Sequence, residues 1–130
     1  MARVFTFRGK TIEELQALSA LDFSKLIGAR ERRSIKRMGT NYKMLIKKVE
    51  AIKKKDPKKA IKTHTREAII LPGWVGLRFG VYNGKEFKDL YVAEPMIGHR
   101  LGEFVFSTKR VLHSAPGIRA TRGSKFLAVK

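Results

Sequence analysis

The sequence predicts an α+β fold: a small mixed or antiparallel sheet of about three strands, packed with N-terminal helices and followed by a basic C-terminal extension. Two patterns indicate this fold. Apolar residues recur at helical spacing between residues 40 and 55. Further along, two strand-like runs, 80–82 and 86–92, flank an Asn-Gly pair.

The chain has 130 residues, which is long enough for one hydrophobic core. We expect a helical, basic region over 1–62, a sheet core over 63–106 and an extended basic tail over 107–130. Together these regions form one domain plus a tail.

The N-terminal residues are predicted to form short helices and one short strand or extended arm. Residues 3–9 alternate in polarity, which is typical of a short strand or extended arm. Thr11, with Glu14 three residues later, indicates a helix start with a capping box. Asp22 is the predicted cap of a second helix, which a basic run follows and Gly39 ends.

A longer helix is predicted from Thr40 until Pro57 stops it. The Lys-rich segment 53–62 is interpreted as a solvated linker. One helical stripe carries the apolar residues of this helix: Tyr42, Leu45, Ile46, Val49 and Ile52.

The hairpin has a predicted register. A minimal two-residue loop would place Val81 opposite Glu86, whereas a four-residue loop over 83–86 lets apolar residues share faces. We therefore predict the longer loop, with the pairs Tyr82–Phe87, Phe79–Leu90 and Leu77–Val92.

Two shorter strands are expected beside the hairpin. Residues 67–71 are almost continuously apolar before Pro72-Gly73, and Val105-Phe106 forms a last strand-like pair.

Charge indicates the class of partner. The formal net charge is +18, and residues 30–66 hold 15 Lys and Arg against 3 acids, which gives +12 in this stretch. Such a concentration favours nucleic acid over a merely solvated helix face, which usually balances its signs. The residues expected to hold phosphates are Arg30, Arg32, Arg33, Lys36, Arg37, Lys47 and Lys48.

A second site of contact with RNA is expected at the sheet. The segment 98–102 places a ring and a guanidinium between glycines, where an RNA strand can approach the backbone closely. The alternative is that these glycines serve only a tight turn. The candidate contact residues are Asn83, Gly84, Lys85, Gly98, His99 and Arg100.

Other classes of site find little support. There is no cysteine, the three histidines are scattered, and no nucleophile, Walker or paired-carboxylate motif is present. We expect no enzyme activity, cofactor, metal, secretory signal or membrane span. The aromatics Trp74, Phe79, Tyr82, Phe87 and Tyr91 form either core or a stacking platform.

The run VYNGKEFKDLYVAEPMIGHRLGEFVFS, residues 81–107, contains a distinctive set of positions: Asn83-Gly84-Lys85, Val92, MIGH, LGEF and Ser107. It closely resembles the signature of the universal small-subunit ribosomal protein family nineteen (fifteen in the eukaryotic naming). Residues 63–76 extend the resemblance, and residues 113–126 resemble the tail of the archaeal and eukaryotic branch.

The resemblance implies a cytoplasmic protein in the head of the small ribosomal subunit, bound to the 3′ domain of the small-subunit rRNA. It also implies the neighbouring small-subunit ribosomal protein thirteen as a partner, near the intersubunit bridges. The tail would reach towards the decoding site and the transfer RNAs, through Lys109, Arg110, His113, Arg119, Arg122 and Lys125. The implied fold is α+β.

We therefore expect a non-catalytic structural RNA-binding protein of the ribosome. Two rivals remain at this point. A free DNA-compacting protein of nucleoid type would use the same cations, and a nuclease would also bind a polyanion. For the tail, the alternative is a disordered solubility segment.

Overall fold

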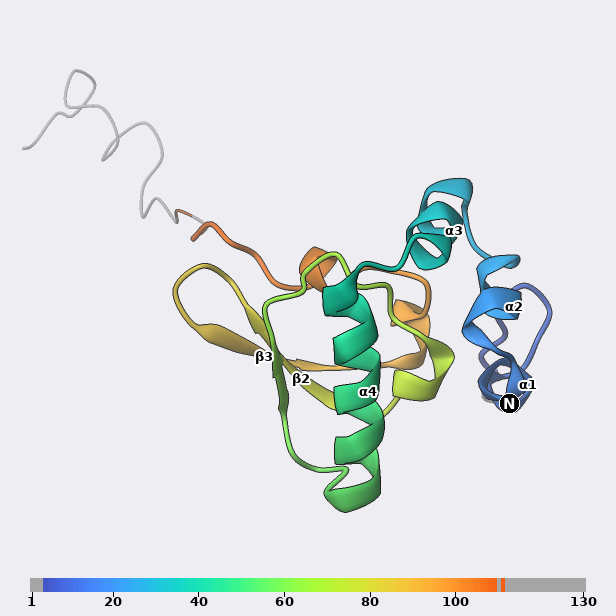
Figure 1. The fold of residues 1–130 in the computed structure, drawn as a ribbon, viewed down its shortest axis with the longest axis horizontal. Coiled ribbons are helices and arrows are strands. Elements are labelled where there is room, and N and C mark those ends of the chain that lie inside the picture. Colours follow the sequence, from blue (N-terminus) through green and yellow to red (C-terminus); the bar gives the residue numbers. More distant parts are fainter. Residues whose placement is uncertain (1–3, 110, 112–130) are drawn as a thin grey trace, which may run out of the picture.

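The computed structural model describes residues 4–109 and 111. In this part of the chain, helices precede a three-stranded sheet, which confirms the α+β class (Figure 1). Of the predicted basic C-terminal extension, residues 110 and 112–130 lie outside the described residues. The elements are α1 Ile12–Ala17, α2 Ala20–Ser24, α3 Ala29–Lys36, α4 Thr40–Lys55, β1 Ile61–Thr63, β2 Arg78–Tyr82, β3 Phe87–Tyr91 and the 3₁₀ turns η1 Pro72–Trp74, η2 Glu94–Met96 and η3 Leu101–Glu103.

The first helices begin with local caps. The carboxylate of Glu14 accepts a hydrogen bond from the Thr11 amide at 3.1 Å, as the capping-box pattern predicts. The prediction of Asp22 as the cap of α2 is wrong, because the hydroxyl of Ser19 accepts from the Asp22 amide. The hydrogen bond from Lys25 lowers the pKa of the Asp22 carboxyl.

The basic run forms a helix of its own. α2 ends at Ser24, and α3 begins at Ala29 after Gly28, so the expected single helix is divided. α4 begins at Thr40 as predicted, and it ends at Lys55 because the residue before Pro57 is driven out of helical geometry.

The hairpin has the predicted register. β2 and β3 pair antiparallel, with Tyr82 opposite Phe87 and Phe79 opposite Leu90. The Val92 amide donates to the Leu77 carbonyl at 3.0 Å, which continues the pairing beyond the strands. Side chains of opposite residues therefore share a face of the sheet. The four-residue loop over 83–86, predicted from the need to pair apolar residues, is confirmed.

β1 is an unexpected strand. It pairs parallel with β2, so the sheet is mixed, in the order β1-β2-β3. The predicted linker over 53–62 is exposed to residue 59, but Ile61 is completely buried and begins the strand. Three residues among lysines carry too little periodicity to be recognised as a strand.

Three predicted strands are absent among the described residues. Residues 67–71 form only an isolated bridge between Ile69 and Arg100, and residues 105–106 form no strand. Near the N-terminus, where a short strand or extended arm was expected over 3–9, Phe7 bridges Lys10 around a tight turn and no strand is formed among the described residues.

The core forms where α4 lies against the sheet (Figure 1). Tyr42, Leu45 and Val49 of its stripe are buried with Phe79 and Trp74. Trp74 and Phe79 are therefore core residues and not a surface platform. The Tyr42 hydroxyl donates to the Ile69 carbonyl at 2.9 Å, and burial raises the pKa of Tyr42.

Arg66 joins three segments of backbone. Its guanidinium donates to the carbonyls of Tyr82 at 2.9 Å and Gly102 at 3.1 Å, and also to that of Val105. The Gly102 amide returns a bond to the Arg66 carbonyl at 2.8 Å. A Cβ on Gly102 would lie 3.0 Å from that carbonyl oxygen, so this close approach favours glycine.

Replacing Arg66 by Met should lower the free energy of unfolding by about 3 kcal/mol, because half-buried carbonyls lose a charged donor. Arg66→Lys should recover little of this, since one ammonium cannot reproduce the guanidinium fork. Urea unfolding measures the change. Arg78→Met is the control: its ion pair with Asp89 is exposed, and the loss should stay below about 1 kcal/mol. Equal losses at the two positions would contradict the role of Arg66.

Replacing Tyr42 by Phe should lower the free energy of unfolding by about 1–2 kcal/mol at neutral pH, because the buried Ile69 carbonyl loses its hydrogen-bond donor. The native chain holds the phenolic proton more tightly than the unfolded chain, whose pKa is near 10.0. The stability from Tyr42 is therefore complete below pH 10 and declines above it. Between pH 8 and 11.5, the melting temperature should fall more steeply with pH for the native protein than for Tyr42→Phe. Parallel pH profiles would contradict this.

Candidate nucleic-acid interface

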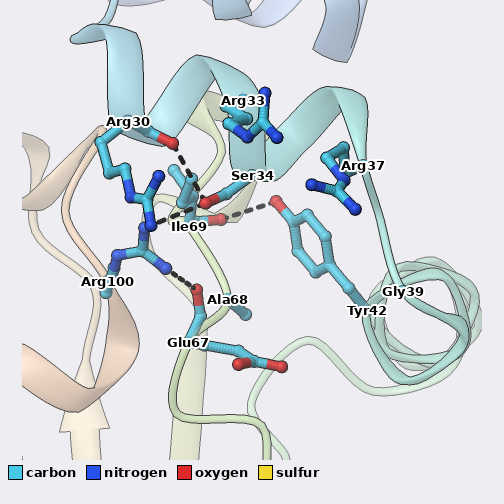
Figure 2. Close-up of a pocket in the computed structure, with 10 residues that line it drawn as sticks. All are labelled: Arg30, Arg33, Ser34, Arg37, Gly39, Tyr42, Glu67, Ala68, Ile69 and Arg100. Atoms are coloured by element: carbon cyan, nitrogen blue, oxygen red, sulfur yellow. Dashed lines mark hydrogen bonds between the residues drawn. The ribbon is translucent and has the colours of Figure 1, made fainter.

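A pocket of about 420 Å³ opens between α3 and the loop at residues 67–69 (Figure 2). Arg30 and Arg33 of α3 and Arg37 at its C-cap stand at i, i+3 and i+7, the spacing of one helical face. The lining residues are Arg30, Arg33, Ser34, Arg37, Gly39, Tyr42, Glu67, Ala68, Ile69 and Arg100.

Arg30, Arg33 and Arg37, called the α3 arginines from here on, are exposed and carry no ion pair within the part of the chain that the structure describes. Figure 2 shows the guanidinium groups of Arg30, Arg33 and Arg37 around the mouth of the pocket. Guanidinium groups match the oxygens of a phosphate through forked hydrogen bonds. The arrangement therefore suits an anion with several oxygens.

Arg100 enters the pocket from the opposite side. Its guanidinium donates to the Glu67 carbonyl at 3.1 Å and to the Ser34 hydroxyl at 3.0 Å (Figure 2). It thus ties α3 to the loop and adds positive charge to the pocket. Ser34 in turn donates to the Arg30 carbonyl at 3.1 Å.

Other predicted phosphate ligands lie elsewhere. Arg32 is half-buried and donates to the carbonyls of Ser24 and Ile27 at 3.2 Å, which places its charge at the end of α2. Lys48 donates to the Lys62 carbonyl at 2.6 Å. Contacts of these two side chains with phosphate stay predictions. Lys36 and Lys47 are exposed outside the pocket.

The hairpin turn is built from the predicted contact residues. The Asn83 side chain accepts from the amides of Lys85 at 2.9 Å and Glu86 at 2.8 Å, and Gly84 has a φ of +99°. Asn83 and Lys85 line a separate hollow with residues 104–109, including the exposed Lys109. The turn and the arginine-lined pocket are therefore two sites, and RNA contact by the turn stays a prediction.

The glycine-flanked segment also has structural roles. Gly98 has a φ of +83°, and a Cβ there would lie 3.3 Å from the Ile27 side chain. The His99 ring nitrogen Nδ1 pairs with Glu103 at 2.8 Å. Gly98 thus serves a turn, as the alternative interpretation held, while His99 is exposed beside it.

The remaining predicted tail residues lie outside the described part of the chain: Arg110, His113, Arg119, Arg122 and Lys125.

Sequence reasoning missed Ser34 and Glu67 as pocket residues and Arg66 as a structural cation. For Ser34 a signal existed, because it stands four residues after Arg30 and three before Arg37 and so shares their helical face. For Glu67 and Arg66 no local signal exists, since their partners are remote in sequence.

Within residues 4–109 and 111, no group of three His, Cys, Asp or Glu side chains is arranged to hold a metal ion. No helix among them combines the length and apolar character needed to cross a membrane.

Known proteins provide independent evidence. The sequence model of the family described as ribosomal protein S19 matches residues 33–113. The small ribosomal subunit protein uS19 of Metallosphaera sedula is 48% identical over 129 residues, covering 97% of this chain and 91% of the relative. The protein of the same name from Saccharolobus solfataricus is 47% identical over 128 residues, with the same coverage of 97% and 91%.

These matches confirm the resemblance seen in the signature. They extend over both the basic helices and the sheet. The chain therefore belongs to the archaeal branch of the ribosomal protein S19 family, whose members are structural constituents of the small ribosomal subunit and not enzymes.

Proposed function

We propose that the chain binds small-subunit rRNA in the head of the ribosomal subunit, in the cytoplasm, and that the arginine-lined pocket holds phosphates of its backbone. The observation that supports this most is the set of α3 arginines on one face, exposed and without carboxylate partners among the described residues. Neutralising such charges with RNA phosphates releases counterions and drives binding.

The finer placement rests on the family resemblance. On this basis we place the chain on the 3′ domain of the rRNA, beside the neighbouring small-subunit ribosomal protein thirteen. Its position would be near the intersubunit bridges and the decoding site. In this proposal residues 1–62 and 63–106 form the rRNA-binding body. Residues 107–130 form a basic arm that approaches transfer RNA.

Replacing Arg30 and Arg33 together by Gln should weaken binding to a transcript of the rRNA 3′ domain. The slope of log affinity against log salt should fall by about 1.5, because two phosphate contacts are lost. Filter binding between 0.05 and 0.3 M salt measures both quantities. The matched control is Lys54→Gln with Lys55→Gln, which removes equal charge from the exposed end of α4 and should change the slope less.

The same assay tests the nucleoid-type rival. At about 0.2 M salt the native protein should prefer the folded transcript to duplex DNA of equal length, because phosphate contacts alone do not distinguish the two and a ribosomal protein should also recognise the folded shape of the RNA. Equal affinity would favour the rival. An unchanged slope for the double variant, with transcript binding intact, would show that phosphates are held elsewhere.

Truncation after Ser107 should leave the body folded, because the buried core cluster of the described residues extends along the chain only as far as Val105. Its melting temperature should stay within about 2 °C, while small subunits assembled with it should translate less efficiently. A fall of several degrees would show that the tail supports the fold.

A further inference from the structure

A second hollow, of about 700 Å³, lies between the first half of α4 and the segment after β1. Asn41 and Met44 line it from the helix, and Met44 is 64% exposed. Lys62 of β1 and His64 of the segment after it line the opposite side. None of the predicted phosphate ligands except Lys48 reaches this hollow, so it is distinct from the arginine-lined pocket.

An aromatic cluster fixes the ring of His64. Its centroid lies 4.6 Å from that of Tyr82 and 5.1 Å from that of Phe87, and these two rings are 5.1 Å apart. His64 is nevertheless exposed and faces the hollow. A ring already held by its neighbours loses little rotamer freedom when a flat ligand stacks on it.

The polar lining suits a nucleotide. Lys48 and Lys62 lie at the hollow, and the ammonium of Lys62 is 5.4 Å from the centre of the Phe87 ring. The amide of Asn41 offers both a donor and an acceptor, as the edge of a base requires. An aromatic ring, an amide and flanking cations are the groups by which proteins recognise unpaired RNA bases.

A peptide strand fits less well. β1 is an edge strand and would offer its backbone to an added strand. However, the Lys48 ammonium already donates a hydrogen bond to the Lys62 carbonyl at 2.6 Å. This blocks part of the edge that strand addition would need.

We infer that this hollow binds one unpaired RNA nucleotide, with its base stacked on His64 between the segment and Met44. The inference rests on the proposed RNA-binding function and adds a contact that reads a base. The pocket at α3 reads only phosphate.

The test compares two ten-nucleotide RNAs, oligo(A) and the same backbone made abasic at every position. His64→Ala should lower affinity for oligo(A) about tenfold, the usual effect of removing one stacking ring, and leave affinity for the abasic strand unchanged. The salt slope should stay the same, because no phosphate contact is lost. His64→Phe should restore binding to oligo(A).

Met44→Ala is a second variant, on the opposite wall and with no aromatic contact to lose. It should weaken oligo(A) binding and spare the abasic strand, and melting curves confirm that each variant is folded. If native protein binds the rRNA transcript but both variants retain full affinity for oligo(A), this inference fails alone. If native protein binds no transcript, the proposed function fails. Displacement of oligo(A) by polyglutamate only when His64 is present would identify an acidic peptide as occupant and overturn the inference.

Discussion

Pairing between residues 66–70 and 98–102 holds this molecule together. Backbone bonds join Gly102 to Arg66 at 2.8 Å, Leu101 to Ala68 at 3.0 Å, and Ile70 to both His99 and Gly98, at 2.8 and 3.1 Å. The pairing is too irregular to form a strand, yet it presents free carbonyls at fixed positions. The Ile69 carbonyl accepts a hydrogen bond from Tyr42 of α4, and Arg100 of the same pairing donates to the Ser34 hydroxyl of α3, so both helices attach to this pairing.

The cations of this chain divide into two kinds. Arg32, Arg66 and Arg100 direct their guanidinium groups to backbone carbonyls and so stabilise junctions between segments. The α3 arginines at the pocket mouth make no such bond and no ion pair among the described residues, so their charges stay available to a polyanion. Net charge in a sequence cannot separate these two kinds. The difference arises from which carbonyls the fold brings within reach.

The sequence predicted best where side-chain periodicity alone decides the structure. The stripe of α4 and the register of the hairpin were correct, because burying one face fixes each of them. β1 and the division between α2 and α3 were missed, because short elements depend on distant partners. For the pocket, Arg30, Arg33, Arg37 and Arg100 were all named in advance, but the split between pocket and hairpin turn required the three-dimensional arrangement.

The arginine-lined pocket also explains how an RNA ligand would act on the protein itself. α3 contacts α2, and Arg100 with Ser34 provides its polar link to the loop. A phosphate held jointly by α3 arginines and Arg100 would add a second link across the same gap and would partly neutralise four neighbouring charges. Because a ligand stabilises whatever state binds it, occupation of the pocket would rigidify α3 against the sheet. The proposed RNA-binding site, at the junction of two segments, would thus couple assembly to folding, without any chemistry performed by the protein.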